Sequence, residues 1–92
     1  MVPVEEIEYV SASGVYAELH TAASRHVIRE SLQALEEQLD PAEFMRIHRS
    51  VIVRLDRVEM LLRGAQGNYE VQLRDGTRLR AGRSRREELE RR

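Results

Sequence analysis

The regular alternation of apolar and polar residues along short stretches is the feature that most constrains the fold. In residues 15–21 and again in residues 69–73, every second side chain is apolar. Successive side chains of a β-strand point to opposite faces of a sheet, so this period of two predicts strands with one buried face. Residues 7–11 are rich in β-branched and aromatic residues and predict a third strand. Further strands are expected at residues 26–29, 51–55 and 58–63.

One segment has helical spacing instead. Three leucines recur there at i, i+3 and i+7, namely Leu32, Leu35 and Leu39. They form one apolar stripe, and Ser31 is a plausible N-cap. Residues 40–43 are expected to end this helix and form a single new turn, after which Phe44 and Ile47 bury against the helix. The sequence therefore predicts a mainly antiparallel β domain with one central helix between its two halves.

The hairpin at Asp75-Gly76 allows a choice between two turn geometries. A two-residue turn would place Leu79 opposite the polar Gln72. A three-residue loop with Gly76 in the left-handed region instead pairs Leu79 with Val71, which keeps both on the apolar face. We therefore predict a type I turn followed by a glycine bulge.

The remaining segments complete the predicted architecture. Residues 11–14 are expected to form the turn between the first two strands, with Gly14 at positive φ. Ser84 is expected to cap a short C-terminal helix over residues 85–92. We expect residues 1–92 to form one domain, cut from a longer protein.

The charges are distributed unevenly, which the formal net charge of −1 conceals. Residues 1–45 contain nine carboxylates and two arginines, a net charge of −7. Residues 46–92 contain thirteen arginines and seven carboxylates, a net charge of +6. Such a chain can present one basic face to nucleic acid while its acidic half points away or meets another domain.

The composition disfavours several other functions. The chain has no cysteine, which excludes disulfides and thiol catalysis, and its three histidines lack metal-ligand spacing. No serine lies in a strand-to-helix elbow, so we expect neither a catalytic site, a metal nor a cofactor. An enzyme using His48 as an acid or base is a distant hypothesis. No apolar stretch approaches the roughly 20 residues that span a bilayer, and we expect a cytoplasmic protein without membrane contact.

Two basic clusters are candidate binding residues. The first precedes a β-branched run and consists of Arg46, His48, Arg49 and Ser50; the second flanks Gly82 and consists of Arg78, Arg80, Arg83, Arg85 and Arg86. Arginine offers planar guanidinium groups that suit bidentate contacts to phosphate and guanine. A structural interpretation without binding has about equal weight for each cluster. The first is then an arginine-rich surface loop, and the second is a solvated face with arginines at a helix end.

Five segments of the chain resemble, in order and spacing, a LytTR-type DNA-binding domain. They are residues 3–10, residues 14–16 with 19–21, residues 31–39, residues 44–53 and residues 79–84. The strongest signature is Phe44-Met45-Arg46-Ile47-His48-Arg49-Ser50-Val51-Ile52-Val53. The resemblance implies an elongated, β-sandwich-like fold of small sheets around a helix that inserts loops into DNA major grooves. It also implies the output domain of a bacterial two-component response regulator.

The resemblance further implies which residues meet DNA. Base contacts are expected from Arg49, from Arg83, and from the loop over residues 13–17, which includes Ser13, Gly14 and Tyr16. Phosphate contacts are expected from Arg46, Ser50, Ser84 and Arg85. His48 is expected to brace the loop, and Tyr16 to lie either in the core or at the DNA. Arg54 and Val15 stand where the family often has asparagine, and Arg54 is expected to add charge to the DNA face.

The leading hypothesis is sequence-specific binding of duplex DNA, coupled to transcription control. The implied partners are double-stranded promoter DNA with repeated sites, a receiver domain in the full-length protein, and a second copy of the chain on DNA. The alternative is a protein-interaction module that docks a partner through its acidic N-terminal half.

Overall fold

The computed structural model describes residues 3–64 and 69–82. Within these residues two short 3-10 helices, one α-helix and eight strands follow one another. In chain order they are η1 (Val4–Glu6), β1 (Ile7–Ser13), β2 (Tyr16–Thr21), β3 (Arg25–Ile28), α1 (Leu32–Gln38), β4 (Phe44–His48), β5 (Val51–Arg54), η2 (Leu55–Arg57), β6 (Val58–Arg63), β7 (Tyr69–Leu73) and β8 (Arg78–Ala81). The predicted C-terminal helix and its cap Ser84 lie outside the described residues.

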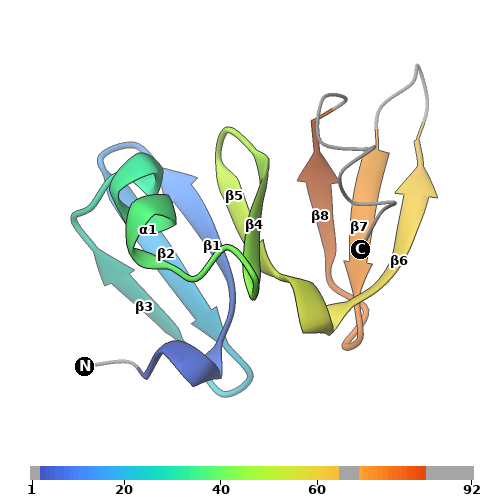
Figure 1. Ribbon diagram of the computed structural model, residues 1–92, viewed down its shortest axis with the longest axis horizontal. Helices are drawn as coiled ribbons and strands as arrows, with labels where there is room; N and C mark the ends of the chain where they lie inside the picture. The colour runs from blue at the N-terminus through green and yellow to red at the C-terminus, as the bar shows by residue number, and fades with distance from the viewer. Residues whose placement is uncertain (1–2, 65–68, 83–92) are drawn as a thin grey trace.

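The strands form two antiparallel sheets, as expected. One has five strands in the order β3-β2-β1-β5-β4, and the other has three in the order β6-β7-β8 (Figure 1). β1 lies at the centre of the larger sheet because it pairs with both β2 and β5. The prediction of a mainly β domain with one α-helix is therefore confirmed.

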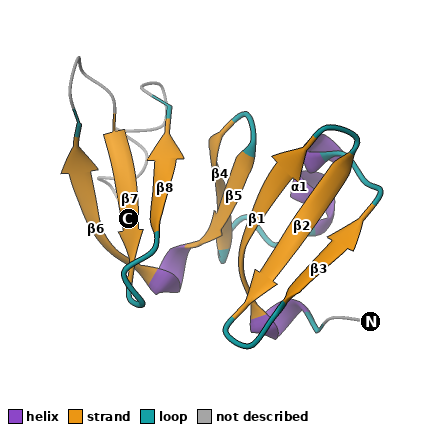
Figure 2. Cartoon of the chain, turned by 180° about the vertical axis from the view of Figure 1, so that it is seen from behind, coloured by secondary structure: helices purple, strands orange, loops and turns teal. Residues whose placement is uncertain are grey.

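Different elements pack against the two faces of the larger sheet, and the smaller sheet reaches only its β4–β5 end. On one face, α1 buries its leucines against β1, β2 and β4 residues that include Val10, Leu19 and Phe44. On the other face, Met45, Ile47, Val51 and Val53 pack against Tyr69, Val71, Leu73 and Ala81 of the smaller sheet. The smaller sheet thus lies beside the β4–β5 end of the larger sheet, and α1 lies on the opposite face of the larger sheet (Figure 2).

The helix forms as its sequence predicts. Ser31 Oγ accepts a hydrogen bond from the Ala34 N–H over 3.1 Å and so satisfies one of the free donors at the helix start. Leu32, Leu35 and Leu39 are all at most 9% exposed. Burying each of these side chains contributes about 1.5–3 kcal/mol, so the stripe fixes α1 to the sheet.

Two expectations about residues 40–48 need correction. Asp40 does hold a single turn, since its carboxylate accepts from the Ala42 N–H over 2.8 Å. The chain then continues as strand β4, which was not predicted. Phe44 packs toward α1, but Ile47 belongs to the core between the two sheets. β4 is buried from both sides and bends at an irregularity between Arg46 and His48, and both effects obscure the simple alternation of a strand.

The β7–β8 hairpin has the predicted register and turn. Val71 lies opposite Leu79, and Tyr69 lies opposite Ala81. The Gly76 N–H donates to the Leu73 carbonyl oxygen over 2.9 Å, and Gly76 has a φ of +94°. These are the marks of a type I turn followed by a glycine bulge.

The first hairpin is tighter than predicted. β1 continues to Ser13, which pairs with Tyr16, so the turn is only Gly14-Val15 rather than residues 11–14. Gly14 does have a positive φ, +63°. Val15 was expected on the buried face of a strand, but it sits at the tip of the turn and is 61% exposed.

Candidate nucleic-acid interface

Three segments that are distant in sequence meet at one side of the molecule. They are the β1–β2 turn, the β4–β5 hairpin and the end of β8, all at the upper side in Figure 1. The Ala12 N–H donates to the Ser50 carbonyl oxygen over 2.9 Å, and the Gly82 N–H donates to the Ile47 carbonyl oxygen over 2.6 Å. We call this side the basic edge and define it by Ser13, Gly14, Tyr16, Arg46, His48, Arg49, Ser50, Arg80 and Gly82. Two backbone hydrogen bonds thus hold its three segments in register.

His48 braces the β4–β5 turn from within. Its Nδ1 accepts a hydrogen bond from the Ser50 N–H over 3.1 Å and lies 2.8 Å from Ser50 Oγ. A ring nitrogen that accepts a backbone N–H is unprotonated, so the hydrogen bond selects a neutral ring with its proton on Nε2. The ring therefore stabilises the turn, in the role predicted for it, while its other nitrogen remains a donor.

The two basic clusters meet around this histidine. Burial lowers the pKa of His48 below its ordinary value, and the positive charges of Arg49, Arg80 and Arg46 lower it further. Arg80 comes from the second cluster, more than thirty positions along the chain. The fold thus concentrates arginines from both clusters on the basic edge, a meeting that depends on how the two sheets pack.

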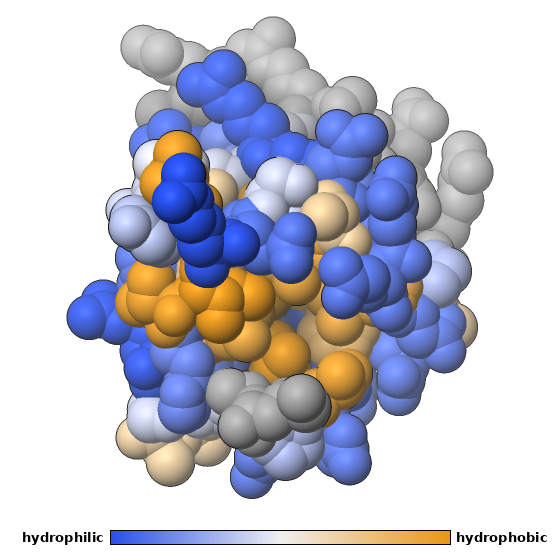
Figure 3. All heavy atoms as spheres, turned by 90° about the vertical axis from the view of Figure 1, so that its left-hand side faces the viewer, coloured by the Kyte–Doolittle hydropathy of each residue, from blue (hydrophilic) through white to orange (hydrophobic). Residues whose placement is uncertain are grey.

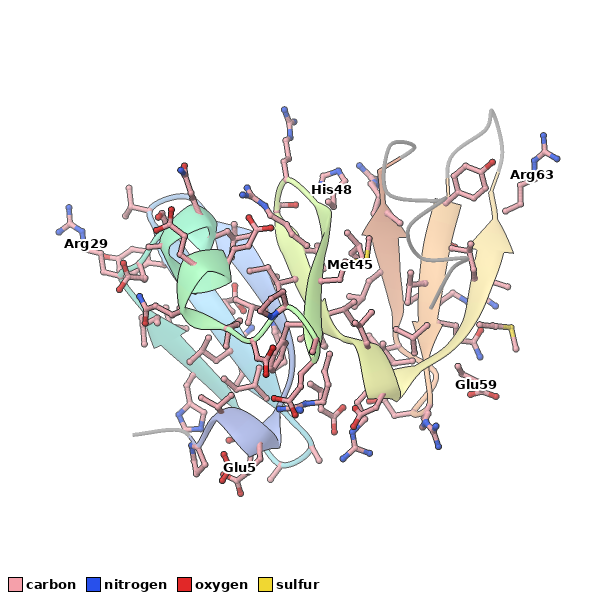
Figure 4. The ribbon with its side chains drawn as sticks, viewed as in Figure 1. Glu5, Arg29, Met45, His48, Glu59 and Arg63 are labelled. Atoms are coloured by element: carbon pink, nitrogen blue, oxygen red, sulfur yellow. The ribbon has the colours of Figure 1, made fainter. Side chains whose placement is uncertain are left out.

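The predicted contact residues differ in how freely they reach solvent. Arg49 is exposed at the hairpin turn, and Figure 4 shows His48 at the same tip. Tyr16 is 48% exposed at the start of β2, which removes it from the core. Ser13 and Gly14 are exposed beside it. Arg83, Ser84 and Arg85 lie outside the described residues, and their expected contacts stay predictions.

Arg46 is largely occupied by contacts within the protein. Its Nη2 donates to the Arg49 carbonyl oxygen over 2.6 Å, and its Nη1 lies 3.4 Å from Glu36 Oε1 on α1. Its side chain is 22% exposed. Arg46 therefore connects the helix to the hairpin turn.

Arg54 does not add charge to the basic edge, contrary to expectation. Its residue is 6% exposed, and its guanidinium donates to the carbonyl oxygens of Ile7 (2.7 Å) and Val4 (2.5 Å). It also stacks over the Phe44 ring at 4.5 Å from the centroid. Arg54 lies at the end of β5 opposite the hairpin turn, where it fastens η1 to the larger sheet.

A second polar network occupies β1 and β2. Tyr9 stacks on His20 with ring centroids 4.0 Å apart, and Ser11 Oγ lies 2.9 Å from His20 Nε2. Glu18 Oε1 forms an ion pair with Arg25 Nη1 of β3 over 3.1 Å.

Among residues 3–64 and 69–82, no group of three histidine, cysteine or acidic side chains is arranged to hold a metal ion. No helix within these same ranges is long and apolar enough to cross a membrane.

An antiparallel β domain that gathers arginines from separate segments on one edge has the form of a nucleic-acid-binding module. The chain belongs to the LytTr DNA-binding domain family, whose model matches residues 1–92.

Similar proteins from bacteria support this membership. The chain is 33% identical over 85 residues to the positive alginate biosynthesis regulatory protein of Pseudomonas aeruginosa, covering 90% of this chain and 34% of that protein. It is 39% identical over 63 residues to the CO-responsive transcriptional regulator RcoM of Rhodospirillum rubrum, covering 68% of this chain and 27% of that protein. The chain thus spans about a third of the length of the curated relatives it matches.

A solved structure shows the same fold. A LytTr DNA-binding domain from Bacillus cereus superposes with a TM-score of 0.86 at 21% sequence identity, over 98% of this chain and 83% of that one. The predicted LytTR-type fold is therefore confirmed.

Proposed function

We propose that this chain binds duplex DNA sequence-specifically through the basic edge, as the output domain of a transcriptional regulator. The observation that carries the proposal is the junction that brings the β1–β2 turn, the β4–β5 turn with exposed Arg49, and the end of β8 with exposed Arg80 to one edge. The major groove of B-DNA is about 12 Å wide and admits elements as large as an α-helix or a two-stranded β-ribbon, so it can admit a β-turn. We therefore propose that the β4–β5 hairpin enters the major groove, and that the β1–β2 turn contacts the DNA beside it.

The exposed arginines suit two kinds of contact. Arg49 projects from the hairpin turn, and we assign it to the O6 and N7 of a guanine, the commonest specific contact that arginine makes. We also propose a phosphate contact for Ser50, in which its hydroxyl turns away from His48 Nδ1, 2.8 Å distant, to donate to a phosphate oxygen. Ser13, Gly14 and Tyr16 line the adjoining turn. We propose that Arg83 reads a second base and that Ser84 and Arg85 hold phosphates, as the resemblance implies.

The wider context is proposed from the relatives. The Staphylococcus aureus transcriptional regulatory protein LytR is 33% identical over 66 residues, which are 72% of this chain and 27% of that protein. We propose that a receiver domain controls this DNA-binding domain, that two copies occupy repeated promoter sites, and that the protein works in the cytoplasm. DNA binding rather than catalysis is the proposed activity.

Selection from random duplex DNA tests the proposal. The 92-residue chain is expected to enrich a defined sequence and to bind it more tightly than a scrambled duplex at moderate salt. Affinity should fall linearly with salt concentration on logarithmic axes, with a slope of about −0.9 for each phosphate neutralised. Failure to enrich any sequence, together with equal affinity for scrambled duplex, would rule out specific recognition.

A protein-docking role for the acidic half is the second candidate. An apolar patch supports this role. It is surrounded by hydrophilic residues on the side of the molecule away from the smaller sheet (Figure 3). On that side Val27 is 56% exposed on the edge strand β3. Charge reversal at Glu36 and Glu37 should abolish a DNA-independent complex with a receiver domain if this role is real.

A further inference from the structure

The side chain of Arg46 turns toward the hairpin backbone and α1. Two of its three nitrogens have partners, the carbonyl oxygen of Arg49 at 2.6 Å and the carboxylate of Glu36 at 3.4 Å. The third nitrogen, Nε, is buried and has no hydrogen-bond partner among the described residues. A guanidinium used in this way has few donors left for a ligand.

The bond to Arg49 acts on the backbone of the proposed base-reading residue. Arg49 and Ser50 form the turn between β4 and β5, and the side chain of Arg49 is exposed. The direction of an exposed side chain depends on the backbone from which it projects. Because the Arg46 guanidinium binds the Arg49 carbonyl oxygen, it limits how the backbone at that position can rotate.

Glu36 completes the arrangement. Its carboxylate approaches Arg46 from α1, which the leucine stripe fixes to the sheet. The carboxylate both orients the guanidinium and balances its charge. A charge balanced in this way adds less to phosphate binding than a free one does.

We infer that Arg46 is a positioning residue that orients Arg49 toward the DNA bases, with Glu36 as its anchor on α1. This inference rests on the proposed DNA binding at the basic edge. It gives Arg46 a role other than the phosphate contact expected from the sequence.

A double-mutant cycle on a selected duplex separates the two roles. Arg46→Ala should lower affinity by about five- to tenfold in the otherwise unchanged chain, but less than about twofold when Arg49 is already alanine, because the two residues act as a unit. The slope of log affinity against log salt should stay unchanged, and base preference at the Arg49 position should weaken. A phosphate contact would instead reduce the slope by about one and weaken all duplexes equally. Additive losses in the cycle, with or without a change of slope, would overturn the inference.

Two glutamates on α1 supply a matched test that leaves the hairpin intact. Glu36 and Glu37 are both exposed, and only Glu36 approaches Arg46. Removing a negative charge near DNA ordinarily strengthens binding, so simple electrostatics predicts tighter binding for both alanine variants. The inference predicts that Glu36→Ala weakens binding about two- to fivefold relative to Glu37→Ala. Equal or tighter binding by Glu36→Ala would overturn it.

These outcomes are distinguishable from failure of the proposed function. If the unaltered chain does not prefer its selected duplex over a scrambled one, then specific DNA binding itself is wrong. If it does, and Arg49→Ala removes the preference while the Arg46 cycle is additive, only the positioning role fails. Backbone amide shifts of Arg49 and Ser50 in the free chain give a further readout, and Arg46→Ala should move both.

Discussion

The backbone N–H of Gly82 donates to the carbonyl oxygen of Ile47 over 2.6 Å, and this bond joins the end of β8 to β4. It couples the smaller sheet to the hairpin of the larger one at the basic edge. A Cβ atom built at position 82 would lie 3.6 Å from that same oxygen, which is an ordinary contact distance. The backbone N–H at position 82 is therefore required for this contact, whereas the absence of a side chain is not.

Gly82→Pro should uncouple the two sheets at this point. Proline removes the donor, and the preceding Ala81 ends a strand in the extended conformation that a following proline favours. Losing the bond should lower the free energy of unfolding by about 0.5–1.5 kcal/mol and weaken DNA binding as well. Gly82→Ala, which keeps the N–H, is the control in urea unfolding and binding assays. Equal behaviour of the two variants would show that this bond is unimportant.

Gly76→Ala should destabilise the β7–β8 hairpin through its backbone alone. Gly76 has a φ of +94°, and nothing lies within 4 Å of a Cβ built there. An L-residue in the left-handed region costs about 1–2 kcal/mol, so the free energy of unfolding should fall by that amount. Gly76→Asn should cost less, because asparagine tolerates this region better. An unchanged midpoint for Gly76→Ala in chemical unfolding would contradict the turn assignment.

Arg54→Ala should be among the more damaging single substitutions. It removes two charge-assisted hydrogen bonds, leaves the carbonyl oxygens of Val4 and Ile7 without this donor, and ends the stacking on Phe44. We expect the free energy of unfolding to fall by about 2–4 kcal/mol. Arg57→Ala, which removes an exposed arginine, should change it by less than about 0.5 kcal/mol. Similar thermal midpoints for both variants would refute the anchoring role of Arg54.

His48 should make stability depend on pH in a known direction. Its pKa in the folded chain lies below the ordinary 6.5, so the unfolded chain binds more protons as the pH falls below that value. The contribution of neutral His48 to the free energy of unfolding is therefore complete above about pH 6.5 and is lost as the pH falls through the lower, folded pKa. His20, whose pKa burial lowers, acts in the same direction.

Arg80→Ala should raise the pKa of His48, since the Arg80 charge is one of the causes that lower it. Arg78→Ala removes the same charge two residues earlier on β8 and is the control. Imidazole resonances followed by NMR over a pH titration at low salt measure both. An unchanged His48 pKa in Arg80→Ala would show that the two basic clusters do not meet as described.

The sequence predicts those parts of the fold whose two faces differ in polarity. In β7 and β8 one face is apolar and the other polar. The register that pairs Val71 with Leu79 is therefore predictable, because it places both apolar side chains on the same face. The leucine stripe of α1 is predictable for the same reason. β4 does not follow from such a pattern, because Phe44 packs toward the helix and Met45 toward the smaller sheet, so adjacent side chains are both buried on opposite faces.

The candidate site was only partly predictable. The arginines themselves are visible in the sequence, and their chemistry favours an anionic partner. Which of them reach solvent depends on tertiary packing: Arg49 projects, whereas Arg54 is buried under η1 by bonds to carbonyl oxygens more than forty residues away. The approach of Arg80 to His48 likewise follows from the packing of the two sheets, which no local pattern records.

Binding of a selected duplex by Arg49→Ala, compared with Arg57→Ala, tests the central claim most directly. The two substitutions remove the same charge from exposed positions at opposite ends of β5, one on the basic edge and one on η2. We predict that Arg49→Ala loses about 1–3 kcal/mol of binding free energy and its preference at one base position, while Arg57→Ala binds nearly as the unaltered chain does. Equal losses for both variants, on selected and scrambled duplexes alike, would contradict DNA recognition by the basic edge.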